Sequence, residues 1–229
     1  MGQRLSASPA RTDRSPARRR QGARALEQLT IAFAPVAPRW RFSRPALQSP
    51  HHARIHERLE FVRRYFPELD GITVRVGLVR KPGVLGWGSL DPEQPGVWVR
   101  PRRLDAFTIA HELTHLLQAR GLIPGGERAC DLWALARSPL LVDTPPGYLR
   151  VPAAIGRQRS LGAADAALLH RAAKLALAAR AGGERQYLRR FEREVAAAAR
   201  ARDAISPAAQ LSSRVARSIV GAFVRPPRA

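Results

Sequence analysis

Residues His111, Glu112 and His115 form the pattern His-Glu-x-x-His, whose residue types and spacing could support metal chemistry. On a helix, residues i and i+4 lie about 40° apart around the axis and about 6 Å apart along it, so both imidazoles can reach one tetrahedral ion. Glu112 is poorly placed to ligate that ion but well placed to take a proton from a bound water. The pattern therefore predicts His111 and His115 as Zn2+ ligands and Glu112 as the general base.

A catalytic zinc site needs a third protein ligand and an open fourth position, and two acidic residues follow the motif. If "GLIPGG" joins two antiparallel helices, Glu127 lies in the first turn of the return helix and can face His115. Asp131, one turn further on, can then accept the outer N–H of a ligating histidine, in the first place His111. We expect one zinc ion per chain with Glu127 as third ligand. Asp131 as the third ligand is the alternative.

The elements that must position these residues follow from the hydrophobic pattern ahead of the motif. Ile55, Leu59, Val62 and Phe66 recur at helical spacing, and Pro67 ends that helix. Residues 72–80 alternate between apolar and polar, as a half-buried strand does, and two glycine-containing segments, residues 83–90 and 96–101, are typical of strands.

Asp105 is the expected N-cap of the helix that carries the motif, and Gly121 ends that helix. Gly126 can start the return helix, which stops before Pro139. Cys130, on the return helix, is more typical of a small buried core residue than of a metal ligand.

Composition divides the chain into three parts. Residues 1–48 are rich in Arg, Ser and Pro and predict a disordered basic tail. Residues 49–150 predict a small α+β domain with a three-stranded antiparallel sheet, the motif helix and the return helix. Residues 151–229 are rich in Ala and Arg and predict a helical C-terminal region, with helices near 163–181, 184–204 and 207–223.

The formal net charge is +21, and most of it lies in the two flanks. Basic flanks attract phosphate backbones and anionic surfaces, so nucleic acid is a possible partner. However, the basic residues are almost all Arg, and Ala and Pro are also abundant, which fits a compositional bias and a solvated basic surface.

Cys130 is the only cysteine, so no disulfide can form within the chain. No apolar run reaches the roughly 18 residues that cross a bilayer, and we expect a cytoplasmic protein without a transmembrane segment. We expect Trp87, Trp98 and Trp133 to be core aromatics, and Trp40 to be an isolated surface residue.

The stretch "HELTHLLQ … GERACDLWALARSPLL" resembles the gluzincin metallopeptidases, and its short spacing resembles the compact minigluzincins. It is also similar to the ImmA/IrrE group, through Glu127, Cys130, Asp131, Trp133 and Ala134. The resemblance covers about residues 50–150 and implies a zincin-like domain. Thr114 departs from the family pattern, in which many relatives have Gly.

The resemblance implies hydrolysis of a peptide or protein substrate. Zinc would polarise the scissile carbonyl, and Glu112 would activate water and pass its proton to the leaving amine. An edge strand ahead of the motif helix would pair with the extended substrate. Such enzymes also use a Tyr or His to steady the oxyanion, for which Tyr148 and His170 are the candidates.

Three functions therefore stand beside one another. The leading prediction is a zinc metallopeptidase. The second is a DNA-associated regulator of the ImmA/IrrE kind, whose basic flanks bind DNA. The third is a zinc-binding module without turnover, which the metal keeps folded.

Overall fold

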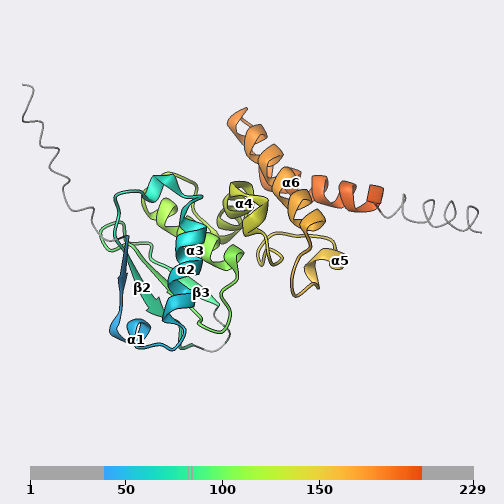
Figure 1. Ribbon diagram of the computed structural model, residues 1–229. Helices are drawn as coiled ribbons and strands as arrows, with labels where there is room; N and C mark the ends of the chain where they lie inside the picture. Colours follow the sequence, from blue (N-terminus) through green and yellow to red (C-terminus); the bar gives the residue numbers. More distant parts are fainter. Residues whose placement is uncertain (1–38, 82, 84, 203–229) are drawn as a thin grey trace, which may run out of the picture. The chain divides into compact units, whose positions relative to one another are not determined.

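The computed structural model describes residues 39–81, 83 and 85–202 (Figure 1). The symbol η marks a short 3-10 helix. In chain order the elements are β1 Trp40–Phe42, α1 Arg44–Leu47, α2 His52–Arg63, η2 Pro67–Leu69, β2 Val74–Leu78, β3 Gly86–Gly88, β4 Gly96–Val99, α3 Ala106–Ala119, α4 Glu127–Arg137, η3 Pro139–Leu141, α5 Ala153–Gly156, α6 Ala163–Ala181 and a helix over residues 187–202.

The protein has an α+β fold whose four strands form one mixed sheet in the order β1-β2-β4-β3. β1, β2 and β4 are parallel, and β3 is antiparallel to β4. The predicted three-stranded antiparallel sheet was therefore wrong in strand number and direction. The connections explain why: α2 lies between β1 and β2, and such a crossover returns the next strand in the parallel direction, whereas the short turn between β3 and β4 joins antiparallel neighbours.

Strand β1 lies within the segment that was predicted to be a disordered tail, so the predicted boundary at residue 48 is too far along the chain. Trp40 is only 7% exposed, and its Nε1 donates a hydrogen bond of 2.6 Å to Glu60 Oε1. The prediction of Trp40 as a surface residue was therefore wrong. Residues 1–38, the rest of the predicted tail, lie outside the described residues.

Helices α2 and α3 pack on one face of the sheet and enclose the core with it (Figure 1). The predicted helical stripe of α2 is confirmed, because its apolar side chains are fully buried. The strands contribute every second residue to this core, as their pleat requires. The core residues from these elements are Ile55, Leu59, Val62, Val74, Val76, Val97, Val99, Ile109, Leu113 and Leu117.

Arg63 is a buried cation in this core that the hydrophobic pattern did not identify. It is 2% exposed, and its guanidinium donates hydrogen bonds to three backbone carbonyls, at Arg39 (3.0 Å), Ile72 (2.8 Å) and Leu69. These bonds tie the start of β1 and the loop before β2 to α2. Because buried carbonyls are costly to leave unpaired, Arg63 fixes the entry to the sheet.

Replacing Arg63 by Met is expected to lower the free energy of unfolding by about 2–4 kcal/mol, since the three carbonyls would lose their donor while apolar packing is kept. Urea denaturation followed by circular dichroism measures the change. Arg64→Met is the matched control, because Arg64 is the exposed neighbour on the same helix end. Equal stability of the two variants would contradict this role of Arg63.

The C-terminal helices pack on α4 and share its core. Helix α6 has the predicted bounds, and the next helix begins at residue 187, three residues later than predicted. Leu169 and Phe191, from these two helices, belong to the same hydrophobic cluster as Leu132 and Leu135 of α4. The third predicted helix, 207–223, lies outside the described residues. Of the helices that are described, none is both long and apolar enough to span a bilayer.

Candidate metal centre

Helix α3 carries the predicted motif and is almost entirely buried. Asp105 occupies the N-cap position, but its side chain caps no backbone group. The carboxylate of Asp143 does this instead, accepting hydrogen bonds from the N–H groups of Ala106 (2.7 Å) and Phe107 (3.1 Å). The predicted N-cap position, Asp105, is therefore right. The capping side chain is not that of Asp105 but that of Asp143, which comes from a distant loop.

The two histidines of α3 are held by their outer ring nitrogens. His111 Nδ1 donates a 2.8 Å hydrogen bond to Asp131, and His115 Nδ1 donates one of 2.9 Å to the Gln118 side-chain oxygen. The ring centroids are 4.9 Å apart. When Nε2 of each ring carries no proton, its lone pair is available to a metal ion, so both rings are oriented as metal-ligating histidines are.

Burial acts to lower the pKa of each of the two histidines, but their neighbours differ. At His111 the hydrogen bond and negative charge of Asp131 outweigh burial, and its pKa is raised. At His115 burial and the neighbouring His111 prevail, and its pKa is lowered. A lowered pKa favours the neutral imidazole, which is the form that binds a metal ion.

Glu127 lies in the first turn of α4, which begins after Gly126 in a left-handed conformation (φ 102°). Its Oε2 is 3.0 Å from His111 Nε2 and 3.4 Å from His115 Nε2. The structure thus brings Glu127 to both predicted histidine ligands at once. Ligands about 2.0–2.2 Å from a tetrahedral zinc lie about 3.3 Å apart, so these two separations fit such an ion.

Cys130 gives the site a second possible third ligand. His111, His115 and Cys130 form a buried group whose ligand atoms all lie within 4.8 Å of one another, and this group could hold a metal ion. Cys130 Sγ is 3.2 Å from His115 Nδ1, and burial raises the pKa of the thiol. The thiol therefore lies beside the protonated nitrogen of His115, on the side of the ring away from Nε2.

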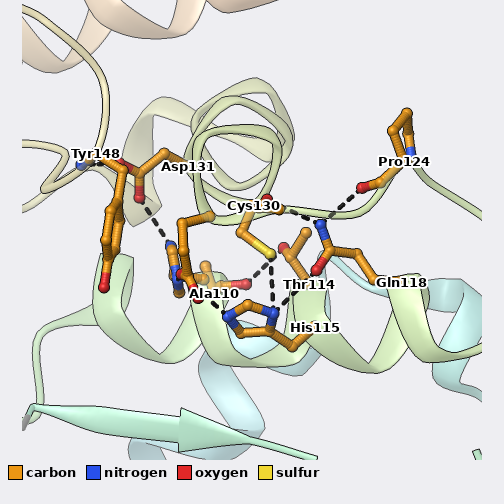
Figure 2. A network of polar contacts seen from close by, with 11 residues as sticks. Ala110, Thr114, His115, Gln118, Pro124, Cys130, Asp131 and Tyr148 are labelled. Atoms are coloured by element: carbon orange, nitrogen blue, oxygen red, sulfur yellow. Dashed lines mark hydrogen bonds and ion pairs between the residues drawn. The ribbon is translucent and has the colours of Figure 1, made fainter. Parts of the chain in front are cut away.

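Asp131 is fully buried and links α3 to the loop that follows α4. One carboxylate oxygen accepts the bond from His111, and the other accepts a 2.6 Å hydrogen bond from the backbone N–H of Tyr148 (Figure 2). The structure places Asp131 beside the histidine that was expected. Asp131 thereby fixes the His111 ring and positions Tyr148.

Gln118 is a site residue that the sequence analysis did not identify. Its side-chain oxygen accepts from His115 Nδ1, and its Nε2 donates to the carbonyls of Pro124 (2.7 Å) and Gly126 (3.0 Å), as Figure 2 shows. Gln118 thus ties His115 to the loop that presents Glu127. The available signal was its position three residues after His115, on the same helix face.

Glu112 lies in the same cleft as His111. Burial, together with the negative charges of Glu127 and Asp131, raises its pKa to about 7, while His111 and a backbone hydrogen bond from Gly88 act in the opposite direction. A carboxyl group with this pKa can both take up and release a proton near neutral pH.

Two glycines of β3 allow the strand to approach Glu112 closely. A methyl group on Gly86 would lie 2.6 Å from Glu112 Oε1, and one on Gly88 would lie 2.5 Å from the backbone oxygen of Glu112. Any larger residue would push the strand away from α3. Glycine at these two positions therefore sets the distance between the edge strand and the carboxylate.

The motif opens into a cleft of about 690 Å3 between β3, α3 and the loop after η3. Tyr148 lines this cleft with its ring stacked on His111 at 5.5 Å between centroids. His170, the other oxyanion candidate, does not line the cleft, and its Nδ1 donates to the carbonyl of Leu135 (2.8 Å). Only Tyr148 of these two candidates lies beside the predicted ligands.

No protein-family model, curated protein or solved structure matches this chain.

Proposed function

We propose that the protein is a zinc-dependent metallopeptidase of the gluzincin type, which hydrolyses peptide bonds. The observation that carries the proposal is the position of Glu127 Oε2, which lies 3.0 Å from His111 Nε2 and 3.4 Å from His115 Nε2 beside an open cleft. Two imidazoles and one carboxylate are a donor set typical of a catalytic zinc, with a fourth position left for water or substrate.

Glu127 is favoured over Cys130 as the third ligand by the orientation of His115. An imidazole ligates an ion through the nitrogen that carries no proton, and Gln118 accepts the proton on Nδ1. Nε2 then faces Glu127, whereas Cys130 lies at Nδ1. The group of His111, His115 and Cys130 could also hold a metal ion.

A zinc ion bound there would polarise a carbonyl oxygen and make a coordinated water more acidic. Glu112 would accept the proton from the attacking water and deliver it to the leaving amine. Tyr148 would donate from its phenol to the developing oxyanion, and Asp131 would hold His111 in the required tautomer.

Among the described residues β3 is an edge strand of the sheet, and this edge supports an extended peptide as substrate. The Ser89 N–H donates a hydrogen bond to the Gly96 carbonyl of β4 (2.8 Å). In an antiparallel pair every second residue of a strand is hydrogen-bonded to its partner strand, so the backbone of Trp87 also pairs with β4. The backbone groups of Gly86 then point away from β4, along the edge beside Glu112. A peptide strand added there would run past the carboxylate.

The proposal is tested first by zinc analysis of the purified wild-type chain beside His115→Ala. About one zinc per chain is expected in the wild type, and none in His115→Ala after dialysis. Arg171→Ala, at an exposed arginine of α6, is the control and should retain the zinc. A wild-type chain that takes up no zinc on reconstitution would exclude the proposed function.

Asp131→Asn is expected to weaken zinc binding about 10- to 100-fold without abolishing it. The amide keeps the size of the side chain, but its NH2 cannot accept the Tyr148 N–H while its oxygen accepts from His111. Competition against a chromophoric chelator measures the affinity. An unchanged zinc affinity would show that this carboxylate does not tune the histidine.

The regulator hypothesis relies on the basic flanks, and residues 1–38 and 203–229 lie outside the described residues. A steep salt dependence of DNA binding would support it. Glu112→Gln distinguishes the peptidase from the zinc-binding module without turnover. The substitution removes peptide hydrolysis if the protein is a peptidase, whereas a module without turnover has no hydrolysis to lose.

A further inference from the structure

The sheet face opposite α2 and α3 carries two tryptophans and two arginines. Alternation along the strands places Arg41, Arg75, Trp98 and Trp87 on this side, because their neighbours face the core. The register sets Arg41 beside Arg75, and Trp98 beside Trp87. We call these four residues and the glycines beneath them the outer face.

Two glycines seat Trp98 on the outer face. A methyl group on Gly77 would overlap the indole of Trp98, and one on Gly96 would lie 2.8 Å from its Cη2. Glycine inside a strand lowers the stability of the sheet. The two glycines beneath Trp98 are accounted for by the space that its indole ring needs. Trp98 therefore lies flat against the backbone of β2 and β4.

Trp87 stacks on Trp98, with 4.6 Å between ring centroids and 33° between ring planes. It remains 59% exposed, so the prediction of Trp87 as a core residue was wrong. Trp98 is explained by its contact with the glycine backbone, which it covers. That contact does not explain Trp87, whose indole lies on top of Trp98. The exposed ring of Trp87 is the platform on which another flat group can stack.

Arg41 and Arg75 are exposed like charges on adjacent strands, an arrangement that is unfavourable without an anion. Among the described residues neither has an ion-pair partner, and Arg75 Nη1 donates only to the Gln94 side chain (2.8 Å). A cleft of about 260 Å3 is lined by both arginines, Gly77 and Trp98. Guanidinium groups beside an indole suit a ligand that combines phosphate with an aromatic ring.

We propose that the outer face binds single-stranded nucleic acid. Trp87 stacks on an unpaired base, and Arg41 and Arg75, which both lie across β4 from Trp87, contact the phosphates that follow on that side. A sheet face with exposed aromatics is suited to this, because every base has a flat surface and stacking does not depend on sequence. The site lies on the other side of the sheet from the metal centre and does not depend on the proposed peptidase function.

Charge argues against two other occupants. The chain's own ends are basic, with seven arginines and two acidic residues in 1–38, so they are repelled by the outer face. A second copy would bring like charges together. The phosphates of duplex DNA could contact the arginines. However, its bases are paired, so no base would be available to stack on Trp87.

The test is fluorescence anisotropy of the full chain with a labelled oligothymidylate, with intrinsic tryptophan emission recorded in parallel. Trp87→Ala keeps the net charge and is expected to weaken binding about 5- to 100-fold. Trp87→Phe should bind within about 3-fold of wild type, because phenylalanine still stacks. Oligothymidylate should quench the wild-type emission, and the quenching should diminish in Trp87→Phe.

Arg75→Ala is compared with Arg171→Ala, which removes the same charge from α6. Arg75→Ala should reduce the slope of log affinity against log salt by about 0.7, while Arg171→Ala leaves it unchanged.

Three results would overturn the proposal. The first is Trp87→Ala binding as tightly as wild type. The second is equal losses in Arg75→Ala and Arg171→Ala, which would indicate diffuse surface charge. The third is a wild-type dimer that Trp87→Ala dissociates, which would assign the outer face to a second copy of the chain.

Discussion

Glu112→Gln is expected to lower kcat for peptide hydrolysis about 100- to 10,000-fold while the chain retains one zinc. Glutamine keeps the size and packing of the side chain against Gly86, but its amide can neither accept nor return a proton. Because Glu112 is not among the converging ligand atoms, metal binding should be unaffected. Hydrolysis of a quenched fluorescent peptide library, with zinc analysis of the same samples, measures both effects.

Glu57→Gln makes the same chemical change at an exposed position of α2 and should leave both kcat and zinc content at wild-type values. If Glu112→Gln hydrolyses peptide as fast as the wild type, Glu112 is not the base. If the wild type binds zinc and cleaves no peptide in the library, the zinc-binding module without turnover becomes the better description.

Glu127→Ala is expected to abolish stable zinc binding, a larger effect than the about 10- to 100-fold loss typical of supporting residues. Two histidines would remain, and two ligands do not complete a tetrahedral protein site. Cys130→Ala, by contrast, should retain about one zinc per chain, because its sulfur lies beside the protonated nitrogen of His115. Zinc analysis after dialysis against a weak chelator separates the two variants.

The reverse result, with zinc kept in Glu127→Ala and lost in Cys130→Ala, would move the third ligand to the thiolate. Asp131→Ala serves as a further comparison, because the sequence also allowed Asp131, in place of Glu127, as the third zinc ligand. Loss of zinc in Asp131→Ala together with its retention in Glu127→Ala would transfer the role to Asp131. Circular dichroism of each variant distinguishes loss of a ligand from loss of the fold.

The return helix shows how a local pattern can indicate a distant contact. The glycines and proline of "GLIPGG" required α4 to reverse direction, and the helical rise then set Glu127 opposite the histidines and Asp131 one turn further on. The structure places Glu127 3.4 Å from His115 and Asp131 2.8 Å from His111, as expected, and Glu127 also lies 3.0 Å from His111. A short connection leaves few ways to return, so this geometry could be anticipated.

Other partners of the site could not be anticipated, because they come from loops whose path depends on the whole fold. Asp143 caps α3 from 36 and 37 residues away, and Tyr148, whose backbone N–H is bound to Asp131, stacks on His111. Likewise, Arg63 is buried because three carbonyls from two segments, at residue 39 and at residues 69 and 72, surround it. No local periodicity encodes these contacts.

The sequence by itself determined what depends on neighbours within one element: the spacing of His111, Glu112 and His115, the apolar stripe of α2, and the bounds of α6. The tertiary structure alone decided how the strands pair and which sheet face is covered. Alternation assigns Trp87 and Trp98 to one side of the sheet, but only the position of the helices leaves that side exposed. The physical reason is that repeat geometry is fixed by bonds over a few residues, whereas the pairing of distant segments depends on which surfaces the complete chain can bury together.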